Sequence, residues 1–344
     1  MGDQIRTGII GLGRSGRDLH GHNLHDSLHY TIAAVADVVE ERLTAARESW
    51  HCRTYDDYRR LLAGSDVELV VIATDSASHC ELTCEALGAG KAVVVDKPMA
   101  VSVQQADRMI AEAEKTGRLL TVFQNRRFDP DFLKVREVID SGILGPVQFI
   151  RRGVYNYSRR TDWQALRKFG GGMLNNWGAH LLDQLLILLN YEVLDVLGDA
   201  RHTISAGDAE DQAVVLIRGR SAAAQMDIFS CCAVPQPEWL VMGKYGTLAG
   251  TGANFTLKYC EAKSLPPLPE TRRIPRVAPE SYPGEDIPWQ EQAVQVKPVN
   301  NTKGFYDRLY ESIRRGQPLA VKPAECREVL RIIELCKQQS AQRK

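Results

Sequence analysis

The chain has 344 residues, of which 44% are hydrophobic and 25% are charged, the composition of a globular protein that can bury a full core. At about 150 residues per domain, this length predicts two domains. Lysine plus arginine and aspartate plus glutamate each total 43, and the resulting formal net charge of zero argues against binding to nucleic acid or to an anionic lipid surface, because both need a positive excess.

Neither the apolar runs nor the cysteines indicate a membrane or secreted protein. No apolar run approaches the roughly 20 residues that cross a bilayer, and the amino terminus runs directly into a strand without a signal segment. The 8 cysteines form no C-x-x-C pair and no set with zinc-ligand spacing, so we interpret them as small buried residues in the reduced form. We therefore expect a soluble protein of the cytoplasm.

Short apolar runs alternate with amphipathic stretches over the first third of the chain. The predicted strands are 5–12, 31–37, 67–74, 92–95 and 119–124, and the predicted helices are 15–28, 39–50, 55–62, 79–87 and 102–115. Because the strands are apolar on both faces and follow a β-α-β rhythm, residues 1–125 are predicted to form an α/β Rossmann domain with a doubly wound parallel sheet of about six strands. Such a domain binds NAD(P).

The rhythm changes after residue 127. Helices are predicted at 130–140, from the glycine run at 170–172 to about 189, at 304–315 and at 323–337, with strands at 147–157, 212–217, 222–229 and 239–242. Residues 261–300 hold 8 of the 15 prolines, which excludes a central strand and favours an extended arm or loop. Residues 126–344 are therefore predicted to form an α+β substrate-binding and oligomerisation domain with an open, largely antiparallel sheet, which predicts a homodimer or homotetramer.

The letters GLGRSG near the amino terminus match G-x-G-x-x-G between a predicted strand and a predicted helix, which is the context that makes this pattern specific for a dinucleotide. Gly11 permits the tight turn, Gly13 lets the backbone approach a pyrophosphate, and Gly16 lets the helix pack on the strand. The helix start, with Arg14 and Ser15, offers free N–H groups and partial positive charge to the phosphates.

Asp37 ends the second predicted strand, about 20 residues after the glycine loop, where a carboxylate accepts hydrogen bonds from the ribose hydroxyls. Its charge would repel a 2′-phosphate, so NAD is favoured over NADP. Arg42 is expected to pair with Glu41 or Asp37 on the surface.

Two further segments carry groups suited to acid–base chemistry. Lys97 follows a buried strand at its carboxyl end, where ligands bind in such sheets, and it could hydrogen-bond a substrate hydroxyl. Asn176 and His180 are four residues apart on one helix face, and His180 could act as a general base. Two simpler interpretations stay open: a solvated lysine, and a core histidine satisfied by a backbone carbonyl.

Together these motifs resemble the Gfo/Idh/MocA family of NAD(P)-dependent oxidoreductases over nearly the whole chain, and the run 122–127 looks most like the inositol-dehydrogenase-type members. The resemblance extends to Thr74, with His79 five residues later, and to the segments 125–130, 170–183 and 304–306. It implies hydride transfer between NAD(H) and a secondary hydroxyl of a sugar, cyclitol or related polyol. It also implies a cis peptide before Pro98 and roles for Lys97 and His180 in the chemistry.

This chain departs from the family pattern at two positions. The family's glutamate before the lysine is Asp96, and its aspartate four residues before the histidine is Asn176. An amide cannot raise the basicity of an imidazole, so His180 is expected to have a lower pKa than its counterparts, with Asn176 fixing the substrate or the imidazole. Two alternatives stay open: an NAD-retaining glycoside-cleaving enzyme, and a non-enzymatic regulator that senses a sugar or a nucleotide.

The expected site draws on both predicted domains. The catalytic residues would be Lys97, His180 and Asn176; the cofactor would contact Gly11, Gly13, Arg14, Ser15, Gly16, Asp37, Thr74, His79, Asp96 and Lys97; the substrate would contact Asn125, Arg126, Tyr155, Trp163, Asn176 and His180. A local excess of basic residues between 126 and 168 would suit an acidic or phosphorylated sugar, although a solvated face balanced by acids elsewhere is the preferred explanation. Histidines 20, 22, 25 and 29 are spread around one helix, so no metal site is expected.

Overall fold

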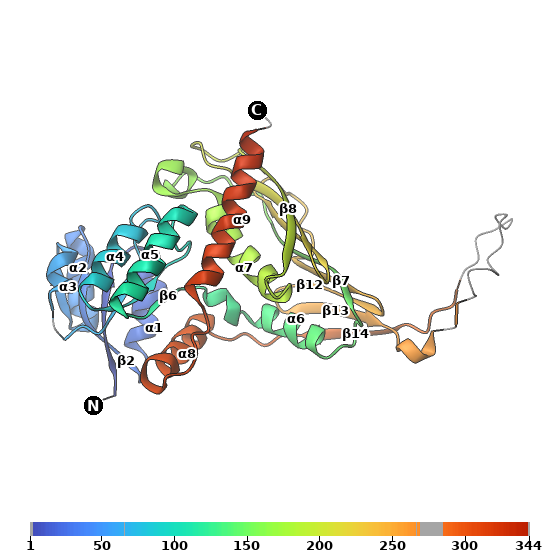
Figure 1. Cartoon of the computed structure of the whole chain (residues 1–344), viewed down its shortest axis with the longest axis horizontal. Coiled ribbons are helices and arrows are strands. Elements are labelled where there is room, and N and C mark those ends of the chain that lie inside the picture. Colours follow the sequence, from blue (N-terminus) through green and yellow to red (C-terminus); the bar gives the residue numbers. More distant parts are fainter. Residues whose placement is uncertain (1–2, 65, 266, 269–284, 343–344) are drawn as a thin grey trace.

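The computed structural model describes residues 3–64, 66–265, 267–268 and 285–342. Two layered units lie side by side, with the long helix α9 (Pro323–Ala341) running between them (Figure 1). The first unit is built on a parallel sheet and the second on a larger mixed sheet. This arrangement leaves the carboxyl ends of the parallel strands facing the second unit.

The first sheet has six strands in the order β3-β2-β1-β4-β5-β6. Their bounds are β1 (Ile5–Ile10), β2 (Tyr30–Ala36), β3 (Arg53–Tyr55), β4 (Leu69–Ile72), β5 (Ala92–Val95) and β6 (Leu120–Val122). All five pairings are parallel, which confirms the predicted Rossmann sheet. The strand order reverses between β1 and β4, and ligands bind outside the strand ends at such a point.

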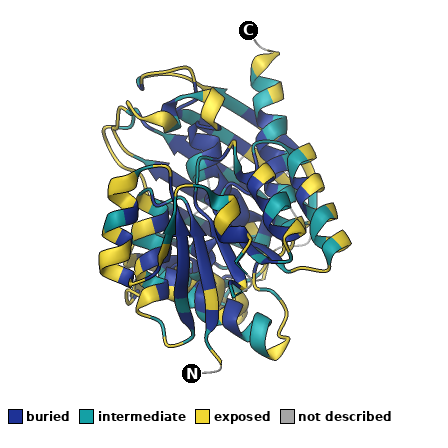
Figure 2. Ribbon diagram, turned by 90° about the vertical axis from the view of Figure 1, so that its left-hand side faces the viewer, coloured by how far each residue is buried: buried dark blue, intermediate teal, exposed yellow. Residues whose placement is uncertain are grey.

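Helices cover both faces of this sheet: in Figure 2 the dark buried strands lie between helices whose outer faces are exposed. The helices are α1 (His22–His25), α2 (Glu40–Trp50), α3 (Tyr58–Leu62), α4 (His79–Gly88) and α5 (Val103–Thr116), and a π-helix (Ser15–Gly21) leads into α1. The sequence placed a helix over 55–62, whereas the chain pairs β3 with β2 before α3 begins. β3 has only three residues, too few to show a strand periodicity.

The second sheet has eight strands in the order β14-β13-β12-β11-β7-β10-β9-β8. Their bounds are β7 (Val147–Tyr155), β8 (Val193–Arg201), β9 (Gln212–Gly219), β10 (Ala223–Phe229), β11 (Trp239–Gly243), β12 (Gly246–Thr251), β13 (Asn254–Tyr259) and β14 (Gln290–Gln295). Only the β7–β10 pairing is parallel, so the largely antiparallel prediction is confirmed. The sequence did not predict β8, β12 or β13. Within the proline-rich stretch, the described part carries β14 at the sheet edge, and residues 266 and 269–284 lie outside the described residues.

One face of the second sheet is covered by helices. These are α7 (Ala179–Leu188), which packs on β7 and β10, and α9, which packs on β8. Helix α6 (Pro130–Asp140) lies nearby (Figure 1). Exposed side chains on the other face include Leu197, Leu216 and Met242. Among the described residues, no helix covers that face.

The two units are fixed against each other by the end of the chain. Helix α8 (Asn301–Arg315) buries Phe305 and Tyr306 in the core of the first unit, and the first half of α9 adds Leu330 to that core. A buried ion pair joins Arg127, after β6, to Asp183 of α7 at 2.6 Å. The chain thus returns to the first unit after completing the second, and α7 is held over the ends of the parallel strands.

Candidate active site

A cavity of about 1280 Å³ lies above the carboxyl ends of the parallel strands. Its lining includes the glycine loop and the ends of β2, β4 and β5 from the first unit, and residues 160–164 and 176–180 from the second. Ligand pockets usually measure roughly 300–1,000 Å³. The cavity therefore has room for a dinucleotide together with a small substrate.

The three glycines of the loop differ in what surrounds them. Gly11 has a φ of 91°, and a Cβ there would lie 2.7 Å from the carbonyl oxygen of Ala73. A Cβ on Gly16 would lie 1.9 Å from the carbonyl oxygen of Gly11, whereas a Cβ on Gly13 would meet nothing within 4 Å. Gly11 and Gly16 therefore let the backbone segments pack, and Gly13 leaves open space in the cavity lining that fits an approaching pyrophosphate.

Asp37 lies in the cavity lining at the end of β2. Its carboxylate accepts hydrogen bonds from the backbone N–H of Leu12 at 2.6 Å and of Val39 at 2.9 Å. Arg42 lies 3.3 Å from the same carboxylate and also lines the cavity. The carboxylate is thus held against the glycine loop, and the expected Arg42–Asp37 pair is present.

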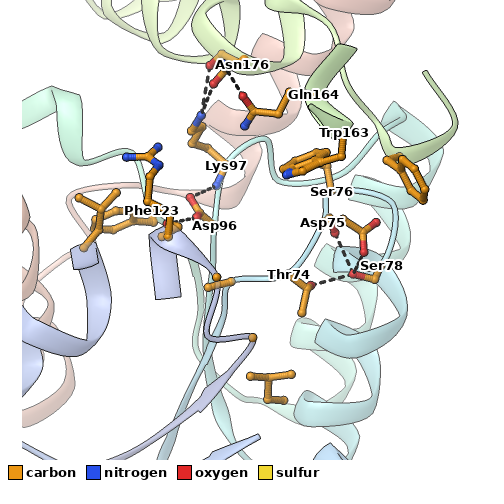
Figure 3. Close-up of a pocket in the computed structure, with 18 of the residues that line it drawn as sticks. Thr74, Asp75, Ser76, Ser78, Asp96, Lys97, Phe123, Trp163, Gln164 and Asn176 are labelled. Carbon is orange, nitrogen blue, oxygen red and sulfur yellow. Dashed lines mark hydrogen bonds between the residues drawn. The ribbon is translucent and has the colours of Figure 1, made fainter. Parts of the chain in front are cut away.

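Asp96 links the glycine loop to the segment that carries Lys97. One carboxylate oxygen accepts a hydrogen bond from the Ser15 hydroxyl, and the other accepts one from the backbone N–H of Lys97 at 2.7 Å (Figure 3). Burial raises the pKa of this carboxyl, but the nearby His20 and Lys97 and the hydroxyl outweigh burial and hold the pKa well below its usual range. Asp96 therefore stays ionised and ties the two segments together.

Lys97 extends from the end of β5 toward the second unit (Figure 3). Its Nζ donates hydrogen bonds to the Asn176 side-chain oxygen at 2.9 Å and to the Asn176 carbonyl at 3.3 Å. Burial lowers the pKa of Lys97 to about 8, and although the charge of Asp96 opposes this shift, that of Arg126 adds to it. The Lys97–Pro98 peptide is cis, as the resemblance implied. This amine is held by its neighbours and can exchange a proton close to neutral pH, unlike a solvated lysine.

The side chain of Asn176 makes no hydrogen bond to the imidazole of His180. It lies in a π-helical turn (Leu174–Gly178) before α7, and its side-chain N–H donates to Gln164 at 3.1 Å while its oxygen accepts from Lys97. The expectation that this amide orients the imidazole is therefore not met, because both of its ends are used by other partners. Asn176 holds the amine instead.

His180 lines the cavity from the first turn of α7. Its Nδ1 lies 3.0 Å from the side-chain oxygen of Gln124, and its Nε2 makes no hydrogen bond to any described residue. Burial lowers the pKa of His180 well below its usual value, and the positive charges of Lys97 and Arg126 lower it further. Burial is thus the largest cause of the lowered pKa of His180. The imidazole is neutral near pH 7.

Most of the other expected residues line the same cavity, but Gly16, Tyr155 and His79 do not. Thr74, Asn125, Arg126 and Trp163 are among the lining residues, together with Arg14 and Ser15. Tyr155 is not: Arg152 of β7 reaches Gln184 of α7, so the alternation of side chains places Tyr155 on the far face of the sheet, where its hydroxyl donates to Asp227 at 2.7 Å. His79 is not either: it is 1% exposed, and its Nδ1 lies 2.8 Å from the carbonyl oxygen of Pro98.

Two lining residues, Gln164 and Asn301, were not singled out from the sequence. Gln164 holds Asn176, and Asn301 accepts a hydrogen bond from Asn125 at 3.1 Å. Trp177 packs under the guanidinium of Arg126, with 4.4 Å to the ring centre. Gln124 is not among the lining residues but contacts His180. Its place just after β6 could have suggested it, whereas Asn301 reaches the site through folding of the distant carboxyl-terminal segment.

Neither a metal cluster nor a membrane span is found in the part of the chain that the structure describes. No group of three or more histidine, cysteine, aspartate or glutamate side chains there could hold a metal ion. In the same residues, no helix is both long and apolar enough to cross a bilayer. His20, one of the crowded histidines, instead forms a hydrogen bond of 2.6 Å with the hydroxyl of Tyr306.

Several curated proteins are similar to this chain in sequence. The oxidoreductase YdgJ of Escherichia coli, described as uncharacterized, is 33% identical over 56% of this chain and 56% of its own length. The NADP-dependent scyllo-inositol 2-dehydrogenase IolW of Bacillus subtilis is 25% identical over 99% and 95% of the two chains. The myo-inositol 2-dehydrogenase of Thermotoga maritima is 30% identical over 64% and 66%. The YdgJ match thus spans little more than half of that relative.

Solved structures share the fold over nearly the full length. An NAD-binding protein from Listeria innocua has a TM-score of 0.82 at 24% identity, covering 99% of this chain and 96% of that one. GenD2 of gentamicin A biosynthesis, solved in complex with NAD, has a TM-score of 0.79 at 24% identity, covering 100% and 96%.

Two family models match consecutive parts of the chain. The model described as the oxidoreductase family with an NAD-binding Rossmann fold matches residues 5–124. The model of the GFO/IDH/MocA C-terminal domain matches residues 132–249. Together they cover the parallel sheet and most of the second sheet. The chain belongs to the Gfo/Idh/MocA family of oxidoreductases, with an amino-terminal Rossmann domain that binds NAD(P).

Proposed function

We propose that this protein is a dehydrogenase that transfers a hydride between a nicotinamide cofactor and the carbon of a secondary hydroxyl in a sugar, cyclitol or related polyol. One observation carries the proposal: Lys97 of the first unit and His180 of the second line one cavity that also contains the glycine loop. The inositol dehydrogenases among the relatives support the substrate class. Their identities of 25% and 30% leave the individual substrate open.

The two side chains have complementary roles in the proposed reaction. A bound nicotinamide would supply the hydride acceptor. His180 would accept the hydroxyl proton at Nε2, which has no other described partner, and Lys97 would donate a hydrogen bond to the reacting oxygen and stabilise its developing charge. Asn176 would act as a positioning residue, because its side chain holds Nζ of Lys97 at 2.9 Å.

We propose NAD as the preferred cofactor. The carboxylate of Asp37 is fixed in the cavity lining by two backbone N–H groups, and a negative charge at this strand end favours ribose hydroxyls over a 2′-phosphate. Arg42 pairs with that carboxylate at 3.3 Å and so offsets part of its charge. The NADP-dependence in the name of IolW makes a direct comparison of the two cofactors necessary.

The substrate end of the cavity combines aromatic and polar groups. Trp163, which is 40% exposed, and Trp177 line the cavity beside Asn125 and Arg126. Aromatic rings with polar neighbours suit a ring-shaped polyol, because the rings pack on C–H surfaces while the polar groups bind hydroxyls. We propose that this wall binds the substrate.

We also propose that two copies of the chain pair through the open face of the second sheet. Leu197, Leu216 and Met242 are 54%, 41% and 37% exposed on that face. Neighbouring exposed apolar side chains on one sheet favour a self-complementary interface. A homodimer, or a tetramer built from such dimers, would cover them.

The purified protein should be titrated with NAD and with NADP and then assayed with a panel of cyclitols, sugars and sugar acids. We expect saturable NAD binding and formation of reduced nicotinamide, detected by its absorbance, with at least one polyol. Binding of NAD without any absorbance change across the panel would contradict the proposal and favour a sensing role. Retention of one NAD per chain through many turnovers would favour the glycoside-cleaving alternative.

A further inference from the structure

We propose that Gln124 is a positioning residue that fixes the tautomer of His180, so that the imidazole carries its proton on Nδ1 and presents an unprotonated Nε2 to the cavity. This inference rests on the proposed role of His180 as the base. It concerns the residue that prepares the imidazole, a role that the sequence had given to position 176.

The direction of the Gln124 amide follows from its partner on α7. The side-chain N–H of Gln124 donates to the carbonyl oxygen of Ala179 at 2.9 Å. A backbone carbonyl only accepts, so the nitrogen of the amide must face Ala179 and the oxygen must face the other way. That oxygen lies 3.0 Å from Nδ1 of His180. Because an amide oxygen also only accepts, Nδ1 must donate and must therefore carry a proton.

The surroundings hold this arrangement in place. Gln124 is 2% exposed and His180 is 6% exposed, so bulk water does not compete for either group. The side-chain amide of Gln124 forms hydrogen bonds to two neighbouring residues of α7, and the backbone of Gln124 directly follows β6. A rotation of the imidazole would leave a buried amide oxygen without a donor, which costs about 1–3 kcal/mol.

The tautomer decides which nitrogen can accept a proton. In a neutral imidazole with a proton on Nδ1, the only lone pair available for proton transfer is on Nε2. Nε2 of His180 has no hydrogen-bond partner among the residues that the structure describes, and the side chain lines the cavity. The base is thus prepared at the nitrogen that a substrate hydroxyl can reach.

An amide at Nδ1 has a different electrostatic effect from a carboxylate. A carboxylate would orient the ring and also stabilise the imidazolium, whereas an amide orients the ring without adding negative charge. Among the charged groups around the ring, Lys97, Arg126 and Arg152 oppose protonation, and only Asp96 favours it. His180 is therefore unprotonated across the neutral range, with Nε2 free to act as the base.

Nitrogen-15 NMR of protein with labelled histidine tests the tautomer directly, without substrate or cofactor. The His180 signals are assigned by their absence in His180→Gln. We expect Nδ1 to show the shift of a protonated nitrogen and Nε2 that of an unprotonated one, and we expect a mixture in Gln124→Leu. A proton on Nε2 in the unsubstituted protein, or an unchanged spectrum in Gln124→Leu, would overturn the inference.

A second measurement separates positioning from stability. Gln124→Glu places a carboxylate at Nδ1, so the acidic limb of the kcat profile should move to higher pH. Gln124→Leu should lower kcat by about 10-fold or more, which is part of the ~10²–10⁴-fold that a positioned base contributes. The control is Gln339→Leu, because Gln339 also bridges two elements, donating to Val196 at 3.0 Å and accepting from Gly198 at 2.6 Å. It should reduce Tm without moving the pH profile.

The two measurements distinguish failure of the inference from failure of the proposed function. If the NMR result is as expected and no polyol is oxidised, the tautomer assignment stands and the dehydrogenase proposal fails. If a polyol is oxidised but Gln124→Glu does not move the acidic limb of the kcat profile, the proposed role of Gln124 is wrong and the dehydrogenase proposal stands.

Discussion

Nζ of Lys97 donates a hydrogen bond of 2.9 Å to the side-chain oxygen of Asn176, and this contact joins the end of β5 to the turn that leads into α7. The amide is neutral, so it accepts the hydrogen bond without stabilising the ammonium as a carboxylate would. Burial lowers the pKa of Lys97 to about 8. A neutral partner at position 176 therefore keeps both the amine and the imidazole of His180 in an environment that disfavours positive charge.

The first prediction concerns that neutral partner. Asn176→Asp should raise the pKa of Lys97 above its present value of about 8 and should also raise the pKa of His180, because a negative charge favours both protonated forms. The base would then be protonated at higher pH, so the acidic limb of the kcat profile should move upward. The control is Asn175→Asp, whose carboxylate would lie beside Lys337. If kcat depended on pH in the same way in both variants, the proposed effect of the neutral side chain at position 176 would be contradicted.

The pH dependence of oxidation follows from the two shifted groups. His180 is neutral above its lowered pKa, and Lys97 is protonated below about pH 8. The rate should therefore be level through neutral pH and should fall as the pH rises past about 8 and the ammonium is lost. In Lys97→Arg the alkaline limb should disappear, because a guanidinium does not lose its proton in this range. Steady-state kinetics over a pH series measure both limbs, and an alkaline limb that persists in this variant would rule out Lys97 as its source.

The glycine loop allows a test that separates ligand binding from folding. A Cβ on Gly13 meets nothing within 4 Å, whereas a Cβ on Gly16 lies 1.9 Å from the carbonyl oxygen of Gly11. Gly13→Ala should leave Tm nearly unchanged and weaken NAD binding by about 10-fold or more, which corresponds to about 1.4 kcal/mol. Gly16→Ala should cost about 1–3 kcal/mol of stability through overpacking. Calorimetry gives both the NAD affinity and the stability. If Gly13→Ala lowered stability without weakening NAD binding, the proposed approach of the pyrophosphate to Gly13 would be excluded.

Cofactor choice is tested at the end of β2. Asp37→Asn removes the charge but retains an oxygen that can accept the hydrogen bond from the N–H of Leu12, which is 2.6 Å long in the unsubstituted protein. The ratio of kcat/KM with NAD to that with NADP should fall by about 10-fold or more, since a fixed negative charge no longer repels the 2′-phosphate. Glu41→Gln, at the exposed start of α2, is the matched control and should keep the ratio of the unsubstituted protein. If the ratio of kcat/KM with NAD to that with NADP stays the same in Asp37→Asn, the proposed preference for NAD loses its basis.

The proposed dimer is tested on the open sheet face. Leu216→Glu should dissociate the dimer, because it places a charge on an apolar contact surface. Leu133→Glu on α6 is the control, since Leu133 is 42% exposed and Leu216 is 41% exposed, but only Leu216 lies on the sheet. Sedimentation analysis of the three proteins reads out the assembly. If Leu216→Glu has the same mass as the unsubstituted protein, this face is not the interface.

Sequence patterns identified the elements whose signals are local. The apolar strands of the first sheet and the glycine loop each depend on residues close together in the chain, and their prediction was confirmed. β3 was not predicted because three residues carry no clear periodicity. β8 was not predicted because exposed polar residues interrupt its apolar pattern. Tyr155 was expected at the substrate because it is close to basic residues, but the register of β7 turns its side chain to the opposite face.

The remaining parts of the site depend on contacts between distant segments. No sequence pattern indicates that Gln124 meets His180 or that Asn301 meets Asn125, because these pairs are 56 and 176 residues apart. It did indicate that Lys97 and His180 are suited to acid–base chemistry, but only the packing of α7 over the parallel strands brings them to one cavity. Specific partners of this kind require the folded arrangement of both units.

The most direct measurement compares Lys97→Ala and His180→Ala with the unsubstituted protein on the polyol that it oxidises, with NAD affinity determined for all three. Both variants should still bind NAD, and their kcat at saturating NAD should fall by about 10²-fold or more, because each removes a group that acts on the reacting hydroxyl. Normal turnover in either variant, with NAD bound, would contradict the central claim that His180 accepts the hydroxyl proton while Lys97 stabilises the reacting oxygen beside the cofactor.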